Sequence, residues 1–339
     1  MSAVEQISPI VSGKPPLAET AVAVSVIIPA LNEEKMIGCC LESLAQLNFA
    51  RDRFEVIVVD NGSADQTIEI AKSFQGRLNL RILEKAGVRI SALRNLGARQ
   101  AQGVVVAFLD ADCLVPSGWL ERMIELVPAN SAGIVGAHYL LPENSSWVGR
   151  TWHRYHEAGK SGEVSHVPAG DLIMRREDFL RLGGFDETIQ TNEDYELCER
   201  ARAGGMAVRA VPEMSVVHLG TAQSLPVFFR KQAWHGTHVV KVFLRNVSGS
   251  HNLKAVLFAA YTLVCLFGII VGAAWAVMDR GAWWAPLVAS AGLFLLPVAL
   301  SMKQVWRSRK WADFFPLTAL YLTYGIARAK ALLSVRNFF

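Results

Sequence analysis

The chain has 339 residues, of which 52% are apolar, and a formal net charge of +4 at pH 7. Residues 1–224 hold 21 Lys and Arg against 28 Asp and Glu, a balance of −7, whereas residues 225–339 hold 13 against 2, a balance of +11. Because the cations of the second half punctuate long apolar runs, this pattern excludes a nucleic-acid-binding face and favours contact with anionic lipid headgroups. We therefore expect a water-soluble first half and a membrane-associated second half.

The cysteines and the N-terminus indicate the cellular compartment of the first half. The five cysteines are odd in number and lack C-x-x-C spacing, so we expect reduced core residues rather than disulfides. The N-terminus has no basic segment followed by an apolar one, which predicts no cleaved signal peptide. Both features place the first half in the cytoplasm.

The first half alternates between strand and helix patterns. Residues 1–22 mix proline, glycine and small polar residues and are expected to form a flexible leader, followed by a catalytic domain at 23–224. Buried strands are predicted at 24–29, 54–59, 80–83 and 104–109, and helices at 37–47, 65–74 and 90–100. Such alternation predicts an α/β fold with a mostly parallel sheet that helices cover on both faces.

Polar residues follow the strongest predicted strands at the points where the strands end. They are Asn32 and Glu34, then Asp60 and Asn61, then Asp110 and Asp112. Because open α/β sheets bind ligands beyond the carboxyl ends of their strands, we expect these side chains to share one site.

The second half begins with residues 225–250, which carry an apolar helical face and scattered cations. This is the composition of an amphipathic helix that lies in the membrane interface, although a helix docked on the soluble domain has the same pattern.

Residues 251–339 form the predicted membrane region. Segments 255–278 and 282–302 are each long and apolar enough to span a bilayer, and Asp279-Arg280-Gly281 between them makes a hairpin. The basic loop 303–310 should be cytoplasmic. A third segment, 314–333, either spans or is re-entrant. We expect a multi-pass protein of the inner (cell) membrane with a cytoplasmic catalytic domain.

Three acidic motifs could take part in binding or catalysis, and each also has an ordinary structural explanation. Asp110-Ala-Asp112 follows a buried strand. Its two carboxylates either bind Mn²⁺ or Mg²⁺, or belong to an ordinary turn. Asp60-Asn-Gly-Ser63-x-Asp65 either contacts a nucleotide or forms a turn with a helix N-cap at Ser63. Asn192-Glu-Asp194 offers a general base, or an acidic first turn of a helix.

Taken together and in order, these motifs resemble glycosyltransferase family 2 over about residues 24–220. The matching segments are Val24 to Glu34, Asp60 to Asp65, Arg94-Asn-Leu-Gly97, Asp110-Ala-Asp112, Gly183-Gly-Phe-Asp186 and Glu193-Asp194. The resemblance implies the Rossmann-like GT-A fold and an inverting, single-displacement transfer of sugar from a nucleotide diphosphate donor.

The resemblance also implies roles for individual residues. Pro29, Ala30, Asn32 and Glu34 would line the nucleotide site, Asp60 would contact the base, and Arg94 would lie near the ribose or diphosphate. Asp110 and Asp112 would hold the donor and its metal ion, with Asp112 the more direct ligand and His218 completing the metal shell. Asp194 would be the general base and Glu193 its neighbour.

Departures from the family pattern keep alternatives open. The segment Arg230-Lys-Gln-Ala-Trp-His235 lacks the Q-x-x-R-W spacing of processive synthases, so we predict a single transfer to a lipid-linked or membrane-embedded acceptor, with a processive polysaccharide synthase as the alternative. A non-catalytic membrane scaffold is the alternative of another class. A nucleotidyltransferase is disfavoured because Ala30-Leu-Asn-Glu-Glu34 is acidic where that class has a basic, Gly-rich loop. Asp171 would bind acceptor hydroxyls or pair with Arg175 or Arg176.

Overall fold

A computed structural model describes residues 22–127, 132–156, 161–237 and 250–333. Its centre is an eight-stranded mixed sheet with the order β3-β2-β1-β4-β8-β6-β9-β7. The strands are β1 (Val24–Ala30), β2 (Phe54–Asp60), β3 (Leu80–Glu84), β4 (Val105–Leu109), β6 (Gly133–Gly136), β7 (Gly162–Glu163), β8 (Asp171–Arg175) and β9 (Ala207–Ala210). The four strands expected from sequence are all present, and they pair in parallel with one another. Strand β8 is antiparallel to both of its neighbours, β4 and β6.

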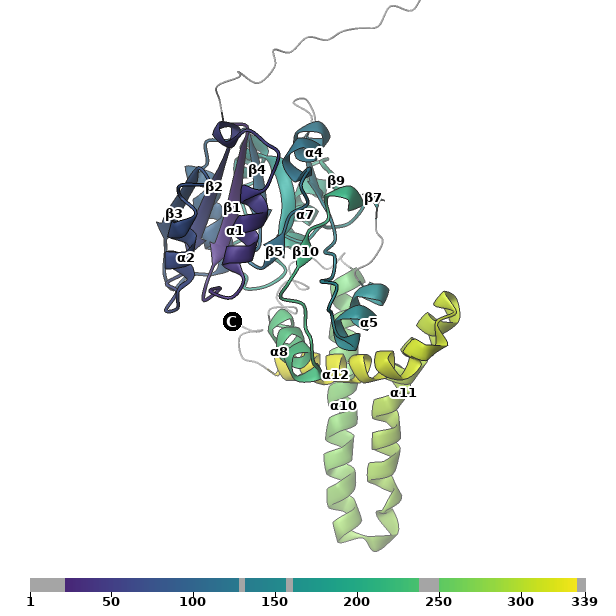
Figure 1. Cartoon of the computed structure of the whole chain (residues 1–339). Coiled ribbons are helices and arrows are strands. Elements are labelled where there is room, and N and C mark those ends of the chain that lie inside the picture. The colour runs from purple at the N-terminus through teal and green to yellow at the C-terminus, as the bar shows by residue number, and fades with distance from the viewer. Residues whose placement is uncertain (1–21, 128–131, 157–160, 238–249, 334–339) are drawn as a thin grey trace, which may run out of the picture.

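Helices cover both faces of this sheet (Figure 1). One face packs against α1 (Ile37–Ala45), α2 (Thr67–Ser73) and α4 (Trp119–Leu126), and the other against α3 (Ile90–Gln100), α6 (Arg176–Arg181) and α7 (Glu193–Ala203). Successive residues of a strand point to opposite faces, so in β1 Val26 and Ile28 join the first cluster and Ile27 the second. Burial on both faces explains why the strands are continuous apolar runs.

The Arg94 to Gly97 and Gly183 to Asp186 segments are joined by Asn95. The Asn95 amide donates to the Phe185 carbonyl at 2.9 Å and accepts from the Phe185 N–H at 2.9 Å. Gly184 has a φ of 74°, and a side chain there would collide with Asn95. Gly97 lies where a Cβ atom would overlap Ile27, so glycine lets α3 rest directly on β1. These segments therefore fix the position of α3.

The second half is helical and extends away from the sheet (Figure 1). Two long helices, α10 (Ser250–Met278) and α11 (Trp284–Ser308), form a hairpin through the short turn η3 (Arg280–Ala282). By length and composition both could cross a membrane, and their apolar side chains are largely exposed, with Val264 at 71% and Ile270 at 67%. So much exposed apolar surface needs a partner other than water.

The third apolar segment forms α12 (Phe314–Leu332), which lies across the hairpin, between it and the sheet (Figure 1). It packs against α10, α11, α5 (Trp147–His156) and α8 (Leu225–His235), and Leu317 and Leu320 are fully buried. Among the described helices it is not one of the two with the length and composition of a span.

Helix α8 is the described part of the predicted amphipathic helix, and residues 238–249 lie outside the described ranges. Its Phe228 is only 2% exposed and packs with Val148 of α5 and Leu320 of α12. This part of the helix therefore packs on both α5 and α12, and its place in the membrane interface stays a prediction. The cysteines are all free, as predicted, but Cys39 is exposed and not a core residue, because it lies on the outer face of α1.

Candidate active site

The loops after β1 and β2 are joined by hydrogen bonds. The Asp60 carboxylate accepts from the N–H groups of Gly62 and Ser63, at 2.7 and 2.8 Å, and from the Ser63 hydroxyl at 2.5 Å. Asn32 has a left-handed backbone with φ 56°, donates its N–H to the Ser63 hydroxyl and accepts from the N–H of Ala64. Asp60 is fully buried, so it shapes the loop that the predicted nucleotide-binding residues share.

The other predicted nucleotide-side residues lie around this loop pair. Pro29 and Ala30 are buried at the end of β1, with Ala30 beside Asp60 in the parallel register. The Glu34 N–H donates to Asp65 at 3.1 Å, and Asp65 accepts from the N–H of Thr67 at 3.1 Å. Because α2 begins at Thr67, the expected helix cap at Ser63 is wrong: the Ser63 hydroxyl is bonded to Asp60 instead.

Glu33, between two predicted residues, was not singled out from the sequence. Burial, followed by the negative charges of Asp112 and Asp110, raises the pKa of Glu33 to about 7, and Lys231 opposes the shift. The β1 loop therefore brings a third carboxylate toward the aspartates that follow β4. Its adjacency to Asn32 and Glu34 was the only signal for it in the sequence.

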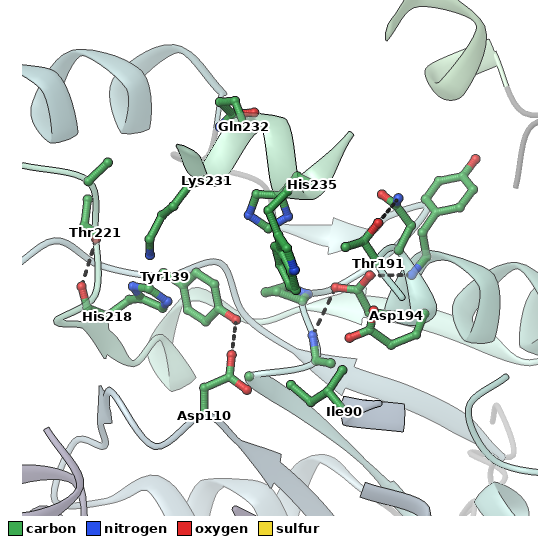
Figure 2. A pocket seen from close by; sticks show the side chains of 18 of the residues that line it. Ile90, Asp110, Tyr139, Thr191, Asp194, His218, Thr221, Lys231, Gln232 and His235 are labelled. Carbon is green, nitrogen blue, oxygen red and sulfur yellow. Dashed lines mark hydrogen bonds between the residues drawn. The ribbon is translucent and has the colours of Figure 1, made fainter. Parts of the chain in front are cut away.

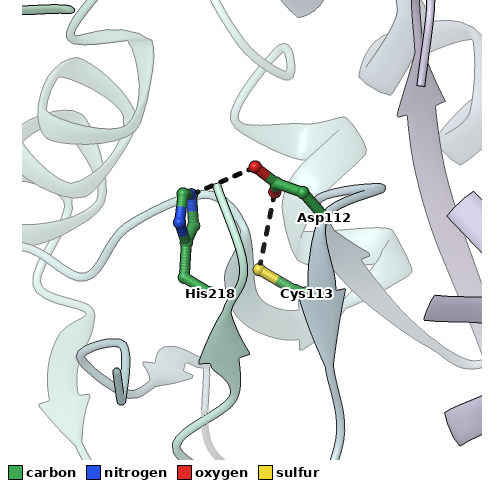
Figure 3. A group of neighbouring side chains, drawn as sticks. All are labelled: Asp112, Cys113 and His218. Atoms are coloured by element: carbon green, nitrogen blue, oxygen red, sulfur yellow. Dashed lines mark hydrogen bonds and ion pairs between the residues drawn. The ribbon is translucent and has the colours of Figure 1, made fainter. Parts of the chain in front are cut away.

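Asp112 and His218 are brought together by a small second sheet. Strand β5 (Cys113–Leu114) pairs antiparallel with β10 (Val217–His218), in a register that sets His218 opposite Cys113. As a result His218 Nε2 lies 3.6 Å from Asp112 Oδ2 (Figure 3). Gly220 lies so close that any side chain there would overlap the Asp112 carboxylate.

Three potential metal ligands meet here, and two of them suit a hard divalent cation. The ligand atoms of Asp112, Cys113 and His218 lie within 4.8 Å of one another (Figure 3). Burial and the charges of Asp110 and Asp112 raise the pKa of the Cys113 thiol, which donates toward Asp112, and sulfur is a soft ligand that suits Mn²⁺ and Mg²⁺ poorly. A carboxylate and an imidazole remain, which is a donor set that fits Mn²⁺.

Asp110 faces a different set of groups. Arg94 Nη2 donates to Asp110 Oδ1 at 2.7 Å, Arg94 Nη1 donates to Glu193 Oε1 at 2.6 Å, and the Tyr139 hydroxyl donates to Asp110 Oδ2 at 3.3 Å. The Arg94 side chain is only 2% exposed. Burial and the neighbouring Asp194 raise the pKa of Glu193, against the opposing charge of Arg94. The arginine expected beside the donor is thus a buried bridge between two site carboxylates.

We expect Arg94→Met to destabilise the protein strongly. Removing the guanidinium leaves Asp110 and Glu193 without their cation in a buried place, which costs about 3–5 kcal/mol. Thermal unfolding of the detergent-solubilised protein checks this. As a control, Arg122→Met removes an exposed pair with Glu125 and should cost under about 1 kcal/mol. Equal losses in the two variants would contradict the bridging role.

Asp194 lies in the first turn of α7, after Asn192, whose φ is 68°. Its carboxylate accepts from the Ala169 N–H at 3.2 Å and from the Tyr195 N–H at 2.8 Å. These bonds aim Asp194 into a cavity of about 410 Å³ that also contains Asp110 and His218 (Figure 2). Asp194 therefore belongs to the acidic first turn of α7 and also lines the cavity, so the two expectations for this residue are compatible.

The cavity is closed by α5 from the first half of the chain and by α8 from the second half. Val148 and Trp152 of α5 and Lys231 and Trp234 of α8 line it opposite the sheet. Lys231 Nζ donates to the Gly220 carbonyl and points toward His218 (Figure 2). Gly220 also lies against the Asp112 carboxylate, so this cation is near Asp112 too. Spacing in the sequence gave no signal for these lining residues, because they come from separate helices.

Asp171 does not take either of its expected roles. It is fully buried at the start of β8 and accepts from the Trp119 indole at 3.3 Å. Arg175 instead pairs with Glu177, and Arg176 donates to the carbonyls of Ala98 and Arg99. Burial raises the pKa of Asp171 well above its ordinary value, which favours the neutral acid at this place in the core. The expectation was wrong because β8 turns this side chain toward α4.

The raised pKa of Asp171 gives a prediction about pH and stability. The folded protein keeps the Asp171 proton at pH values where the unfolded chain, with a pKa of about 3.9, has released it. Stability is therefore lost as pH rises above about 4, and Asp171→Asn, which has no proton to lose, should gain relative to wild type between pH 5 and 8. Melting temperatures across this range test it. A constant difference would refute it.

Comparison with known proteins agrees with this geometry. The model of the family described as "Glycosyl transferase family 2" matches residues 25–183. Glycosyltransferase AglE of Haloferax volcanii is 40% identical over 235 residues, covering 67% of this chain and 76% of AglE. Validoxylamine A glucosyltransferase of Streptomyces hygroscopicus subsp. limoneus is 29% identical over 218 residues, covering 54% of this chain and 48% of that protein.

The structural comparison concerns the fold. Mannosyltransferase PcManGT from Pyrobaculum calidifontis superposes with a TM-score of 0.61 and 20% identity, covering 91% of this chain and 87% of that one. The mixed sheet with helices on both faces is the GT-A arrangement. The chain is 40% identical to AglE over about three quarters of that protein, and the family model matches as well. The chain therefore belongs to glycosyltransferase family 2 and is a GT-A glycosyltransferase.

Proposed function

We propose that the protein transfers a sugar, with inversion, from a nucleotide diphosphate donor to a lipid-linked or membrane-embedded acceptor at the cytoplasmic face of the membrane. The observation that carries this proposal is the cavity that holds Asp110 and Asp194 on its sheet side and is closed by α5 and α8. Both helices rest on α12, which lies across the apolar hairpin. The reacting groups therefore lie next to the part of the chain that we place in the bilayer.

The donor side is supported by the loops after β1, β2 and β4. PcManGT was solved in complex with GDP-Man and Mn²⁺, and we infer a nucleotide sugar and Mn²⁺ or Mg²⁺ for this chain too. Asp112 and His218 would hold the ion, while Asp110 would act on the donor through its fixed position beside Arg94. When bound, the ion stabilises the negative charge of the departing nucleotide diphosphate. Pro29, Ala30, Asn32, Glu34 and Asp60 would form the nucleotide side.

The acceptor side uses Asp194. Its carboxylate takes the proton from an acceptor hydroxyl as that oxygen attacks the anomeric carbon of the sugar and the bond to the diphosphate breaks. Attack from the face opposite the leaving group inverts the anomeric centre. Arg94 and Glu193 hold Asp110 and the start of α7 in place, so the donor and base sides keep a fixed separation.

The orientation proposed for the membrane follows from charge and aromatic residues. The end of the hairpin nearest the sheet carries Lys303, Arg307, Arg309 and Lys310, and the far end has exposed Trp275, Trp283 and Trp284. Basic residues favour the cytoplasmic side, and tryptophan favours both interfaces. The catalytic domain would then meet a soluble donor in the cytoplasm and a lipid-borne acceptor at the bilayer.

The decisive experiment incubates the full chain in membranes with a panel of nucleotide sugars, Mn²⁺ and a lipid extract. Mass spectrometry of the lipid fraction should find one glycosylated lipid, made only with one donor. A product confined to the aqueous phase would overturn the lipid acceptor. A series of products lengthened by repeated units would instead favour a processive synthase.

A further inference from the structure

A basic groove lies beside α5, apart from the active-site cavity. It has a volume of about 370 Å³ and is formed where α5 meets the end of α11. The lining residues are Arg154, Tyr155, Gln304, Arg307, Ser308 and Lys310. None of them belongs to the donor or acceptor side described above, so the groove has no role in the proposed reaction itself.

The charges in this groove are not balanced. Arg154 pairs with Asp313 of the short turn η4 (Trp311–Asp313), and the Tyr155 hydroxyl donates to the same carboxylate at 3.0 Å. Within the described parts of the chain, Arg307 and Lys310 enter no ion pair, so the groove keeps an excess of two positive charges. Exposed cations around a concave surface attract an anion.

The surroundings of the groove indicate which anion. Trp306 and Trp311 are the sequence neighbours of the groove residues Arg307 and Lys310, and they are 59% and 48% exposed, with ring centroids 5.8 Å apart. The Arg309 guanidinium lies 5.8 Å from the Trp306 ring centroid. These residues directly follow the long apolar stretch of α11, at the level where a bilayer would change from hydrocarbon to headgroups.

We propose that the groove binds the phosphate headgroup of an anionic phospholipid between Arg307 and Lys310. The Ser308 hydroxyl, which lies 3.1 Å from the Tyr155 oxygen, is placed to donate to a phosphate oxygen, while the Tyr155 hydroxyl keeps its bond to Asp313. The lipid tails would lie along α11, beside Trp306. This inference rests on the membrane placement proposed above, and it adds a lipid site that is separate from the acceptor.

Lipid binding in the groove should affect the active site through α5, which lines both. Arg154 and Tyr155 face the groove, whereas Val148 and Trp152 of the same helix line the catalytic cavity. A lipid that fixes the C-terminal turn of α5 therefore also fixes a wall of the acceptor site. We expect sugar transfer to be faster in bilayers that contain anionic lipid than in bilayers of neutral lipid alone.

The test uses the full chain in nanodiscs of phosphatidylcholine, with or without phosphatidylglycerol. Native mass spectrometry of the released protein counts the phosphatidylglycerol molecules that stay bound. Each surface cation contributes about fivefold to the affinity for anionic lipid, so removing one groove cation, in Arg307→Gln or in Lys310→Gln, should weaken retention by roughly fivefold. Lys303→Gln is the matched control, because it removes a cation from the same helix outside the groove. That control should retain the lipid almost as wild type does.

The outcomes separate this inference from the proposed function. Equal losses in the groove variants and the Lys303→Gln control would mean diffuse attraction to the membrane surface, and would overturn the site. Displacement of the lipid by millimolar inorganic phosphate would assign the groove to a soluble anion and overturn the lipid as its ligand. Failure of the wild-type chain to enter nanodiscs of either composition would instead contradict the membrane placement.

Discussion

Asp194→Asn should lower the rate of sugar transfer by about 10²–10⁴-fold, because a neutral amide cannot take the proton from the attacking hydroxyl. The amide oxygen can still accept one of the two backbone hydrogen bonds that hold the carboxylate, so the start of α7 should stay in place. Donor affinity should change little, since Asp194 lies on the acceptor side of the cavity. Transfer rates together with nucleotide binding by calorimetry measure both effects.

The matched control for this variant is Glu196→Gln. Glu196 lies on the same helix and pairs with Arg200, so its replacement removes one acidic charge from α7 without touching the cavity. Transfer by the control should stay within about threefold of wild type, since the ion pair that it breaks is worth under about 1 kcal/mol. If Asp194→Asn transferred sugar as fast as this control, another group would have to be the base.

Asp112→Ala should abolish metal-dependent turnover of the donor. Loss of a carboxylate ligand removes several kcal/mol of charge stabilisation from the transition state, which corresponds to roughly a thousandfold in rate. His218 alone cannot hold the ion, so the Mn²⁺ concentration for half-maximal activity should also rise steeply. Donor hydrolysis and transfer, each titrated with Mn²⁺ and with Mg²⁺, provide the measurement.

Two comparisons make the Asp112 experiment informative. Asp52→Ala removes an exposed acid at the opposite end of β2 and should leave the metal titration unchanged. His218→Ala should weaken metal binding less than Asp112→Ala, because it removes a neutral ligand and not a charged one. Activity in Asp112→Ala without added metal would exclude the metal mechanism. Wild-type protein with no affinity for any nucleotide would favour the scaffold alternative.

Much of the sheet follows directly from the sequence, for a local reason. The runs Val24 to Pro29, Phe54 to Val59 and Val104 to Leu109 are apolar at every position or nearly so, which suits only strands buried on both faces. The polar residues that follow them had to lie at one edge, because parallel strands end on the same side. The predicted strand positions were therefore accurate to about one residue, and the hairpin of α10 and α11 followed from length and hydropathy alone.

The direction of the Asp171 side chain could not be predicted from such local patterns. Its neighbours in the sequence are Gly170 and Leu172, and neither indicates whether β8 turns the carboxylate toward the cavity or toward the core. The direction depends on the register of β8 against β4, which pairs Asp171 with Leu109. A shift of one residue would reverse the direction of every side chain in the strand. Pairing between distant strands therefore decides whether this aspartate does chemistry or is a buried core group.

The sequence by itself determined the order of the strands along the chain, the acidic triplet after β4 and the two apolar helices, since each depends on neighbouring residues. Only the tertiary structure decided how distant residues meet. Pairing of β5 with β10 puts His218 beside Asp112, 106 positions earlier in the chain, and burial of α3 turns Arg94 from an expected donor ligand into a bridge between Asp110 and Glu193. Packing of α5 and α8 on α12 closes the cavity, because helix contacts depend on three-dimensional shape and not on spacing in the sequence.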